Sequence, residues 1–230
     1  PDMLANRADI YNLGDIIGDS AKAFKLSYLE NSLTSNPTLA PLAMKARKDL
    51  YTMIEGVETA RLEDLQLEGS YSGEELKSYI NVLTKLLYVR DVVLRVNKAY
   101  IHSAGMSDAY RTEPAFKLQG SYRNMNKLAE KVSPIMNDKE LNTLLLAHYE
   151  GEVQTLTSDA EGNLLKLKEL LGLQSNKEKA RWEEIKQTFN KNKLFASADG
   201  TDRMAQILAQ LDDFNSGLRG IKEALNGNGK

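Results

Sequence analysis

The sequence predicts an all-α protein, a multi-helix bundle with at most one remnant strand near the N-terminus. Three observations support this: long stretches rich in Leu, Ala, Lys and Glu, few runs of β-branched residues, and only five prolines among 230 residues. Residues 9–13 alone have the composition of an edge strand. The rest of the chain is expected to fold as helices joined by short loops.

The clearest predicted helix runs from residue 73 to about residue 104. Ser72 can cap its first turn, and Glu75 completes a capping box three residues later. Apolar residues recur at helical spacing along a stripe wide enough to be buried from several sides. We therefore expect this helix to lie at the centre of the bundle. The stripe includes Leu76, Ile80, Leu83, Leu87, Leu94 and Ile101.

Two helices are predicted before the central one. The first covers residues 22–35 and ends at Asn36-Pro37, because proline cannot continue a helix. The second covers residues 41–67.

After the central helix, residues 105–120 are expected to form an irregular loop.

Five helices are predicted after that loop. Ser121 caps the first, which bends or stops near Ser133-Pro134. Asn137 and Glu140 open the next, which ends near Gly151. The remaining helices are expected at residues 158–171, 175–190 and 201–226, with a hinge candidate at 196–200.

Composition excludes several classes of function. The net charge of −2 gives no general basic field for polyanions, and the absence of cysteine excludes disulfides and thiol chemistry. No apolar run approaches the roughly 20 residues of a membrane span. We expect a cytoplasmic protein without a membrane partner, and the first residue, Pro1, indicates a fragment of a longer chain.

Arg123 is the residue with the strongest functional signal. It follows Gly120-Ser121 and lies in the first turn of a predicted helix, where the helix dipole disfavours a positive charge. An arginine there requires an anionic partner, either Glu113 or a phosphate.

Other candidate sites carry weaker signals. His102 and His148 lack the spacing of metal ligands. An acid pair could form among the acidic residues of loops and helix ends, although such residues are usually solvated. Trp182 stands among charged residues and is interpreted as a packing anchor rather than a base-stacking platform. The candidate acids are Asp108, Glu113, Glu150 and Glu152.

Residues 177–193 contain six basic and three acidic side chains. This excess of positive charge could contact nucleic acid, but a solvated helix face is the simpler interpretation.

The chain has no Gly-x-x-x-x-Gly-Lys-Ser/Thr loop to bind phosphates and no apolar strand ending in paired acids to hold Mg²⁺. We therefore expect no ATP hydrolysis by this chain alone.

Three blocks of sequence carry a resemblance to a known family. They are LANRADIYNLGD at residues 4–15, EPAFKLQGSYRNMNK at 113–127 and HYEGE at 148–152. The chain resembles, over roughly residues 1–172, a bacterial group of MoxR-like AAA+ proteins labelled DNA-repair ATPases. The resemblance implies that residues 1–18 end the AAA+ core, residues 19–172 form the helical lid, and residues 173–230 are a helical tail.

The resemblance also implies roles for single residues. Arg7 would be the arginine finger offered to a neighbouring subunit, and Arg123 the sensor 2 arginine that contacts the terminal phosphates. Tyr122, Arg123 and Lys127 would bind the nucleotide. ATP and Mg²⁺ would be the cofactors of the full-length protein, and the partners would be the rest of the core and a homo-oligomeric ring. Two alternatives remain open: a helical scaffold or adaptor without a nucleotide role, and a helical nucleic-acid-binding module.

Overall fold

The computed structural model describes residues 20–197 and 210–219, and every regular element within these ranges is helical. This confirms the predicted all-α class for the described part of the chain. The chain divides into two compact units, one made of residues 1–107 and 115–173 and the other of residues 108–114 and 174–230. Arg7, the strand predicted at 9–13 and most of the helix predicted at 201–226 lie outside the described residues.

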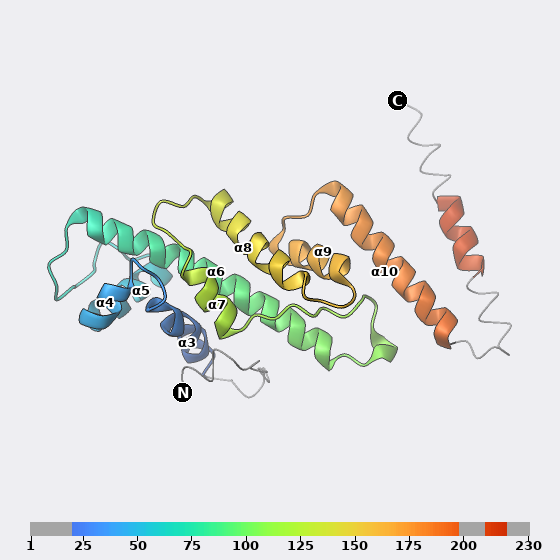
Figure 1. Cartoon of the computed structure of the whole chain (residues 1–230), viewed down its shortest axis with the longest axis horizontal. Coiled ribbons are helices and arrows are strands. Elements are labelled where there is room, and N and C mark those ends of the chain that lie inside the picture. The colour runs from blue at the N-terminus through green and yellow to red at the C-terminus, as the bar shows by residue number, and fades with distance from the viewer. Residues whose placement is uncertain (1–19, 198–209, 220–230) are drawn as a thin grey trace, which may run out of the picture. The chain divides into compact units, whose positions relative to one another are not determined.

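The first unit contains seven described helices (Figure 1). The second contains the 3₁₀ turn η2 (Asp108–Tyr110), the helix α10 (Asn176–Ser197) and helical residues 210–219. The helices of the first unit are α3 (Ala21–Leu33), α4 (Ala40–Lys45), α5 (Arg47–Thr59), α6 (Gly73–Gly105), α7 (Tyr122–Ala129), α8 (Asp138–Val153) and α9 (Ala160–Leu171).

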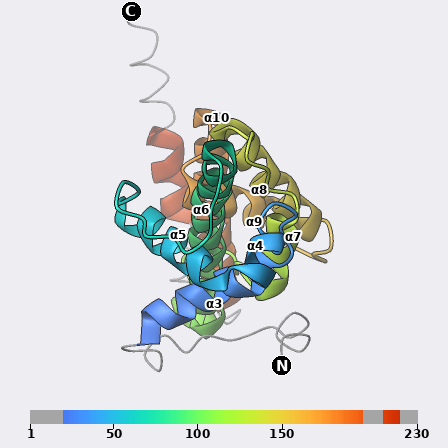
Figure 2. The same cartoon turned by 90° about the vertical axis from the view of Figure 1, so that its left-hand side faces the viewer.

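The long helix α6 forms the centre of the first unit, as its apolar stripe predicts. Ser72 and Glu75 make the expected capping box at its start. Helix α6 packs against α3, α5, α7 and α9, and Figure 2 shows it in the middle of the view with α5 on one side and α7 on the other. Val82, Leu86 and Val93 are fully buried. Burial on more than one side is what a wide apolar stripe requires.

The helix predicted for residues 41–67 is wrong in two places. The backbone breaks at Ala46, which separates α4 from α5. Helix α5 then ends at Thr59. The next residue, Ala60, has a left-handed φ of 56°, so the chain turns back along the helix. Residues 61–71 pack as a loop instead, and Leu65 covers Gly56 so closely that a Cβ there would lie 2.5 Å from its side chain.

The carboxylate of Asp49 holds this loop on α5. It accepts hydrogen bonds from the backbone N–H groups of Glu68 (2.7 Å) and Gly69 (2.9 Å) and from the Tyr71 hydroxyl (2.6 Å). The Tyr71 hydroxyl and the Glu68 N–H lower the pKa of Asp49, because they stabilise its charged form. Tertiary hydrogen bonds thus replace the helical ones that local propensity favours.

Residues 115–120, named the strap here, cross the first unit without regular structure. Side chains of three helices satisfy its backbone groups. Ser103 of α6 accepts a hydrogen bond from Phe116 N (2.8 Å), Asn163 of α9 accepts one from Lys117 N (2.6 Å), and Tyr28 of α3 donates to Gly120 O (2.9 Å). The strap is therefore fixed along its whole length.

Gly120, the last residue of the strap, lies directly on the backbone of α6. A Cβ at this position would be 1.8 Å from the Val93 carbonyl oxygen and 2.7 Å from Asn97 N. Such distances leave no room for any side chain. Glycine is thus required here by close approach, and its place determines where α7 begins.

Helix α7 is fixed at its other end by Asn36, which is fully buried. The Asn36 amide donates to the carbonyl oxygens of Ala129 (2.8 Å) and Val132 (2.9 Å), and its oxygen accepts from Thr38 N (3.0 Å). One side chain therefore caps the C-terminus of α7 and shapes the turn before α4. This explains why α7 stops at Ala129, earlier than Ser133-Pro134 would require.

In the second unit, Trp182 of α10 is buried, with 2% of its surface exposed. This agrees with its interpretation as a packing anchor. Asn190 donates to Thr112 O (2.9 Å), and Lys193 donates to Ala109 O (2.7 Å). Helix α10 extends to Ser197, beyond the end predicted near Asn190.

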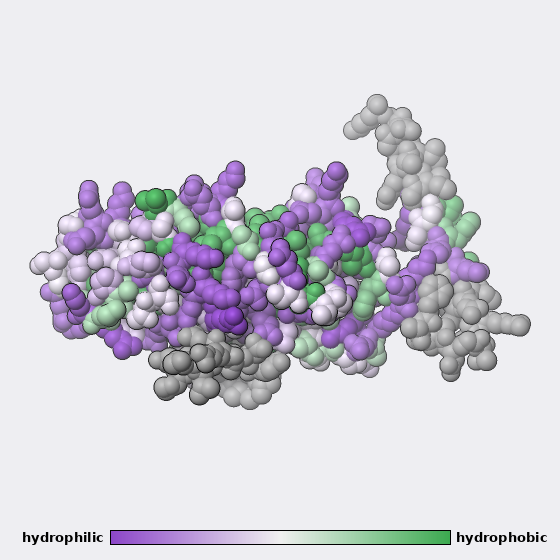
Figure 3. Space-filling model, in the orientation of Figure 1, coloured by the Kyte–Doolittle hydropathy of each residue, from purple (hydrophilic) through white to green (hydrophobic). Residues whose placement is uncertain are grey.

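Hydrophilic residues predominate on the face drawn in Figure 3, with hydrophobic residues interspersed among them. Two of the most exposed large apolar side chains of the first unit, Met44 and Ile135, lie in separate elements, α4 and the loop after α7. Scattered exposed apolar residues are normal in folded proteins.

Replacement of Gly120 by alanine is expected to destabilise the first unit strongly. The new methyl group would overlap a backbone carbonyl that cannot rotate away, so the strap or α6 must shift, at a cost of about 3 kcal/mol or more. Urea unfolding followed by circular dichroism would measure the change.

Gly151→Ala is the matched control, because a Cβ at this position of α8 would meet nothing within 4 Å. Alanine is the better helix former, so the control should gain about 0.5–1 kcal/mol. Equal stability of the two variants would contradict the close packing of Gly120 on α6.

Candidate functional site

Arg123 is exposed and is the second residue of α7. Ser121 caps this helix and Asn124 completes the capping box, with Ser121 N donating to the Asn124 side-chain oxygen (3.1 Å). Among the residues that the structure describes, Arg123 has no ion-pair partner. No described carboxylate thus lies within ion-pair distance of Arg123, although a cation at a helix start favours a nearby anion.

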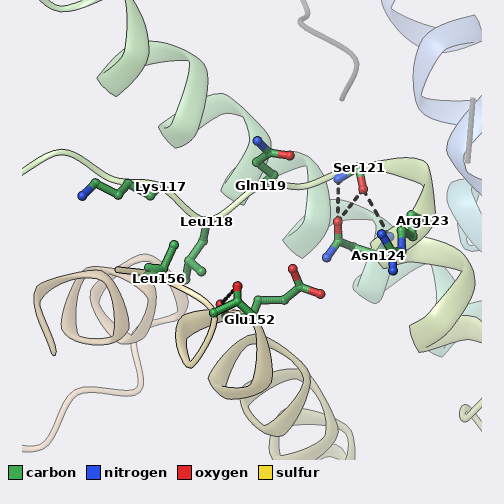
Figure 4. Close-up of a pocket in the computed structure, with 9 residues that line it drawn as sticks. Lys117, Leu118, Gln119, Ser121, Arg123, Asn124, Glu152 and Leu156 are labelled. Carbon is green, nitrogen blue, oxygen red and sulfur yellow. Dashed lines mark hydrogen bonds between the residues drawn. The ribbon is translucent and has the colours of Figure 1, made fainter. Parts of the chain in front are cut away.

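A pocket of about 240 Å³ opens beside this helix start (Figure 4). The strap forms one wall of the pocket, and the first turn of α7 closes one end. The opposite wall is formed by the end of α8 and the loop that follows it. Leu118 and Leu156 make its middle apolar. Its polar lining is Lys117, Gln119, Ser121, Arg123, Asn124, Glu152 and Thr155.

His148 of α8 fixes the side chain of Asn124. The Asn124 amide nitrogen lies 3.0 Å from His148 Nε2. Because the Asn124 oxygen already accepts hydrogen bonds from Ser121, its amide group is the donor and His148 Nε2 the acceptor. This assignment places the imidazole proton on Nδ1.

The pKa of His148 is lowered from its ordinary value to about 4. Burial is the largest cause, because it disfavours the charged imidazolium. Lys127 and Lys131 lower the pKa further, while Glu152 raises it. His148 is therefore neutral at physiological pH, as its role as a hydrogen-bond acceptor requires.

Lys127 and Glu152 form the second link between α7 and α8, with 3.7 Å between Nζ and Oε1. Both side chains are about half exposed, at 44% and 41%. Surface pairs of this kind contribute little to stability, so either side chain can exchange this partner for another.

The predicted nucleotide-contacting residues separate in the structure. Arg123 lines the pocket, whereas Tyr122 turns toward α3, where its ring stacks on Tyr28 at 4.2 Å and its hydroxyl shares a hydrogen bond with Ser27 (2.6 Å). Lys127 reaches Glu152 and is not part of the pocket lining. Tyr122 therefore holds α7 on α3, and Lys127 faces α8, so neither side chain lines the pocket.

Two of the three blocks that carry the family resemblance meet at this pocket. The Asn124–His148 hydrogen bond and the Lys127–Glu152 pair join residues 113–127 to residues 148–152. Composition and helical period do not reveal these contacts, since they depend on how α7 packs on α8. The third block, which contains Arg7, lies outside the described residues.

Lys117 is a pocket residue that sequence reasoning missed. Its ammonium group donates to the Ser158 hydroxyl (2.7 Å) and pairs with Asp159 (2.7 Å). Asp159 has a left-handed φ of 62° and stands just before α9. No sequence pattern marks a lysine in an irregular strap, so only the fold could identify it.

Two of the four candidate acids have cationic partners in the described structure. Asp108 pairs with Arg111 (2.9 Å) and Glu152 with Lys127. In the described ranges, no cluster of three or more His, Asp or Glu residues could hold a metal ion.

None of the described helices has the length and apolar character to cross a membrane.

Most basic side chains of residues 177–193 have partners within the second unit. Arg181 pairs with Glu184, Lys186 with Glu183 and Lys191 with Asp213, while Lys193 donates to backbone carbonyl groups. These contacts favour a solvated, internally paired helix face over a nucleic-acid surface.

Comparison with models of protein families, with curated proteins and with solved structures finds no match to this chain. The functional interpretation therefore depends on the geometry of the pocket and on the three blocks of sequence.

Acid should weaken the fold through His148. Its pKa is about 4 in the folded state and about 6.5 in an unfolded chain, so unfolding takes up a proton between these values. The contribution is fully present above pH 6.5 and is lost as the pH falls toward 4, with a slope of at most about 1.4 kcal/mol per pH unit.

His148→Gln provides the comparison, because its side-chain oxygen can accept the Asn124 hydrogen bond without titrating. Urea unfolding at a series of pH values should show a shallower pH dependence for this variant between pH 6.5 and 4. Identical slopes for the two proteins would contradict a half-buried, neutral His148.

Proposed function

We propose that residues 19–172 are the helical lid of a MoxR-like AAA+ ATPase and that Arg123 contacts the terminal phosphate of ATP held by the rest of the core. The observation that carries the proposal is an exposed guanidinium at a capped helix start, beside a pocket and without an ion-pair partner among the described residues. A phosphate supplies the missing negative charge and can accept two parallel hydrogen bonds from the guanidinium.

The stiffness of the surrounding structure supports this role. Gly120 fixes the strap on α6, the Ser121–Asn124 box fixes the first turn of α7, and His148 fixes Asn124. A cation that is held in place before the ligand arrives needs no reorganisation as charge develops on the transferring phosphate. Arg123 would thus act as a sensor that couples nucleotide state to lid position.

Lid movement follows from the loss of this contact. While ATP is bound, attraction to the terminal phosphate draws the start of α7 toward the core. Hydrolysis and phosphate release remove that attraction, so the lid rotates back. Mg²⁺ and the phosphate-binding loop would belong to the core, and Arg7 would reach the nucleotide of the adjacent subunit in a ring. The label of DNA repair comes only with the resemblance and adds no residue to the site.

Arg123→Ala in the full-length ATPase is expected to lower ATP turnover on the order of 10²-fold, the usual effect of removing one fixed donor from a developing charge. Steady-state phosphate release would measure it. Arg61→Ala is a suitable control, because Arg61 is an exposed arginine of the loop after α5 and does not line the pocket.

Arg7→Ala should reduce turnover by roughly 10³-fold or more in the assembled ring, because an arginine supplied in trans stabilises the transition state directly. Mixing this variant with a second variant that lacks the phosphate-binding lysine should leave some mixed interfaces active. Unchanged turnover in both the Arg123 and Arg7 variants would contradict the motor assignment and favour a helical scaffold.

A further inference from the structure

The pocket beside Arg123 contains an acidic side chain that the proposed phosphate contact does not use. Glu152, from the last turn of α8, lines the same pocket as Arg123 and Ser121. In Figure 4 its carboxylate group turns toward the side of the pocket where Ser121, Asn124 and Arg123 lie. A negative charge therefore stands in the space that a phosphate would enter.

A carboxylate in an anion site must either be neutralised or move away. Glu152 is about two-fifths exposed, so its side chain has room to move. Lys127 can draw it aside, because its ammonium group lies 3.7 Å from the Glu152 carboxylate on the neighbouring helix. That distance is longer than a normal charged hydrogen bond, which leaves room for the two groups to close.

We propose that Glu152 competes with the incoming phosphate for the positive end of this pocket and that Lys127 draws the carboxylate aside when phosphate binds. Glu152 determines how tightly the site holds an anion, and Lys127 is a positioning residue that acts through it. This inference rests on the proposed function of Arg123 as a phosphate contact. It replaces the direct nucleotide contact that the resemblance implies for Lys127.

The consequence is a site that releases phosphate readily. In the empty pocket the carboxylate turns toward the side where α7 begins (Figure 4), and the positive end of the helix dipole favours a negative charge on that side. A bound phosphate must displace that favourable arrangement, so the net affinity is lower than the cations alone would give. A low affinity suits a contact that has to form and break once in each ATP cycle.

Glu152→Gln tests the first half of the proposal. Isothermal titration of the 230-residue chain with sodium tripolyphosphate at neutral pH and constant ionic strength measures the affinity directly. Removal of one negative charge at contact range in water should tighten binding by about three- to tenfold. Glu150→Gln is the control, since it removes the same charge from the same helix and does not line the pocket.

Lys127→Met separates a positioning role from a direct contact. With Glu152 present, this variant should weaken tripolyphosphate binding, because nothing then draws the carboxylate aside. In the Glu152→Gln background it should change the affinity by less than twofold. An equal loss in both backgrounds would show that Lys127 contacts the phosphate itself and would overturn the proposal.

The result with Arg123→Ala distinguishes failure of this inference from failure of the proposed function. If that variant loses tripolyphosphate binding while Glu152→Gln behaves like Glu150→Gln, Arg123 remains the phosphate contact and competition by Glu152 is wrong. If tripolyphosphate binds no variant, or binds Arg123→Ala as well as the parent chain, the phosphate site itself is wrong. Far-ultraviolet circular dichroism of each variant confirms that the helices are intact.

Discussion

The contact between Gly120 and α6 is the constraint on which the rest of the first unit depends. The backbone of the strap reaches the Val93 carbonyl oxygen so closely that only glycine fits. This contact places the end of the strap on the most buried stretch of the central helix, and α7 begins two residues later. The direction of α7, the position of Arg123 and the wall of the pocket all follow from it.

Buried polar side chains also fix the positions of the strap and of the turn before α4. The strap and the turn before α4 have backbone groups that no helix satisfies, and such groups are costly to bury without partners. Asn36, Asn163 and Tyr28 supply those partners. Each joins elements more than 45 residues apart in the sequence, so the bundle is specified by a few polar contacts as well as by its apolar core.

The sequence predicted correctly those helix ends that depend on neighbouring residues. Its predictions failed where contacts between distant residues determine the structure. The Ser72, Ser121 and Asn137 caps lie where the sequence places them, because a capping box involves only four consecutive residues. The helix predicted at 41–67 failed because Asp49 and Gly56 favour a packed loop. At the site, the exposure of Arg123 followed from the cap, whereas the inward turn of Tyr122 needed knowledge of Tyr28.

The candidate site combines a rigid frame with charged side chains that can rearrange. Arg123 stands on a helix start that glycine, a capping box and a neutral histidine all hold in one geometry. Glu152 and Lys127 are half exposed and loosely paired, so they can rearrange at little cost. A ligand shifts a conformational equilibrium only by the difference in its affinity for the two states. Because the frame does not yield, an anion that bound Arg123 would act on the first unit as one body, and the charges within the pocket would adjust the strength of that attraction.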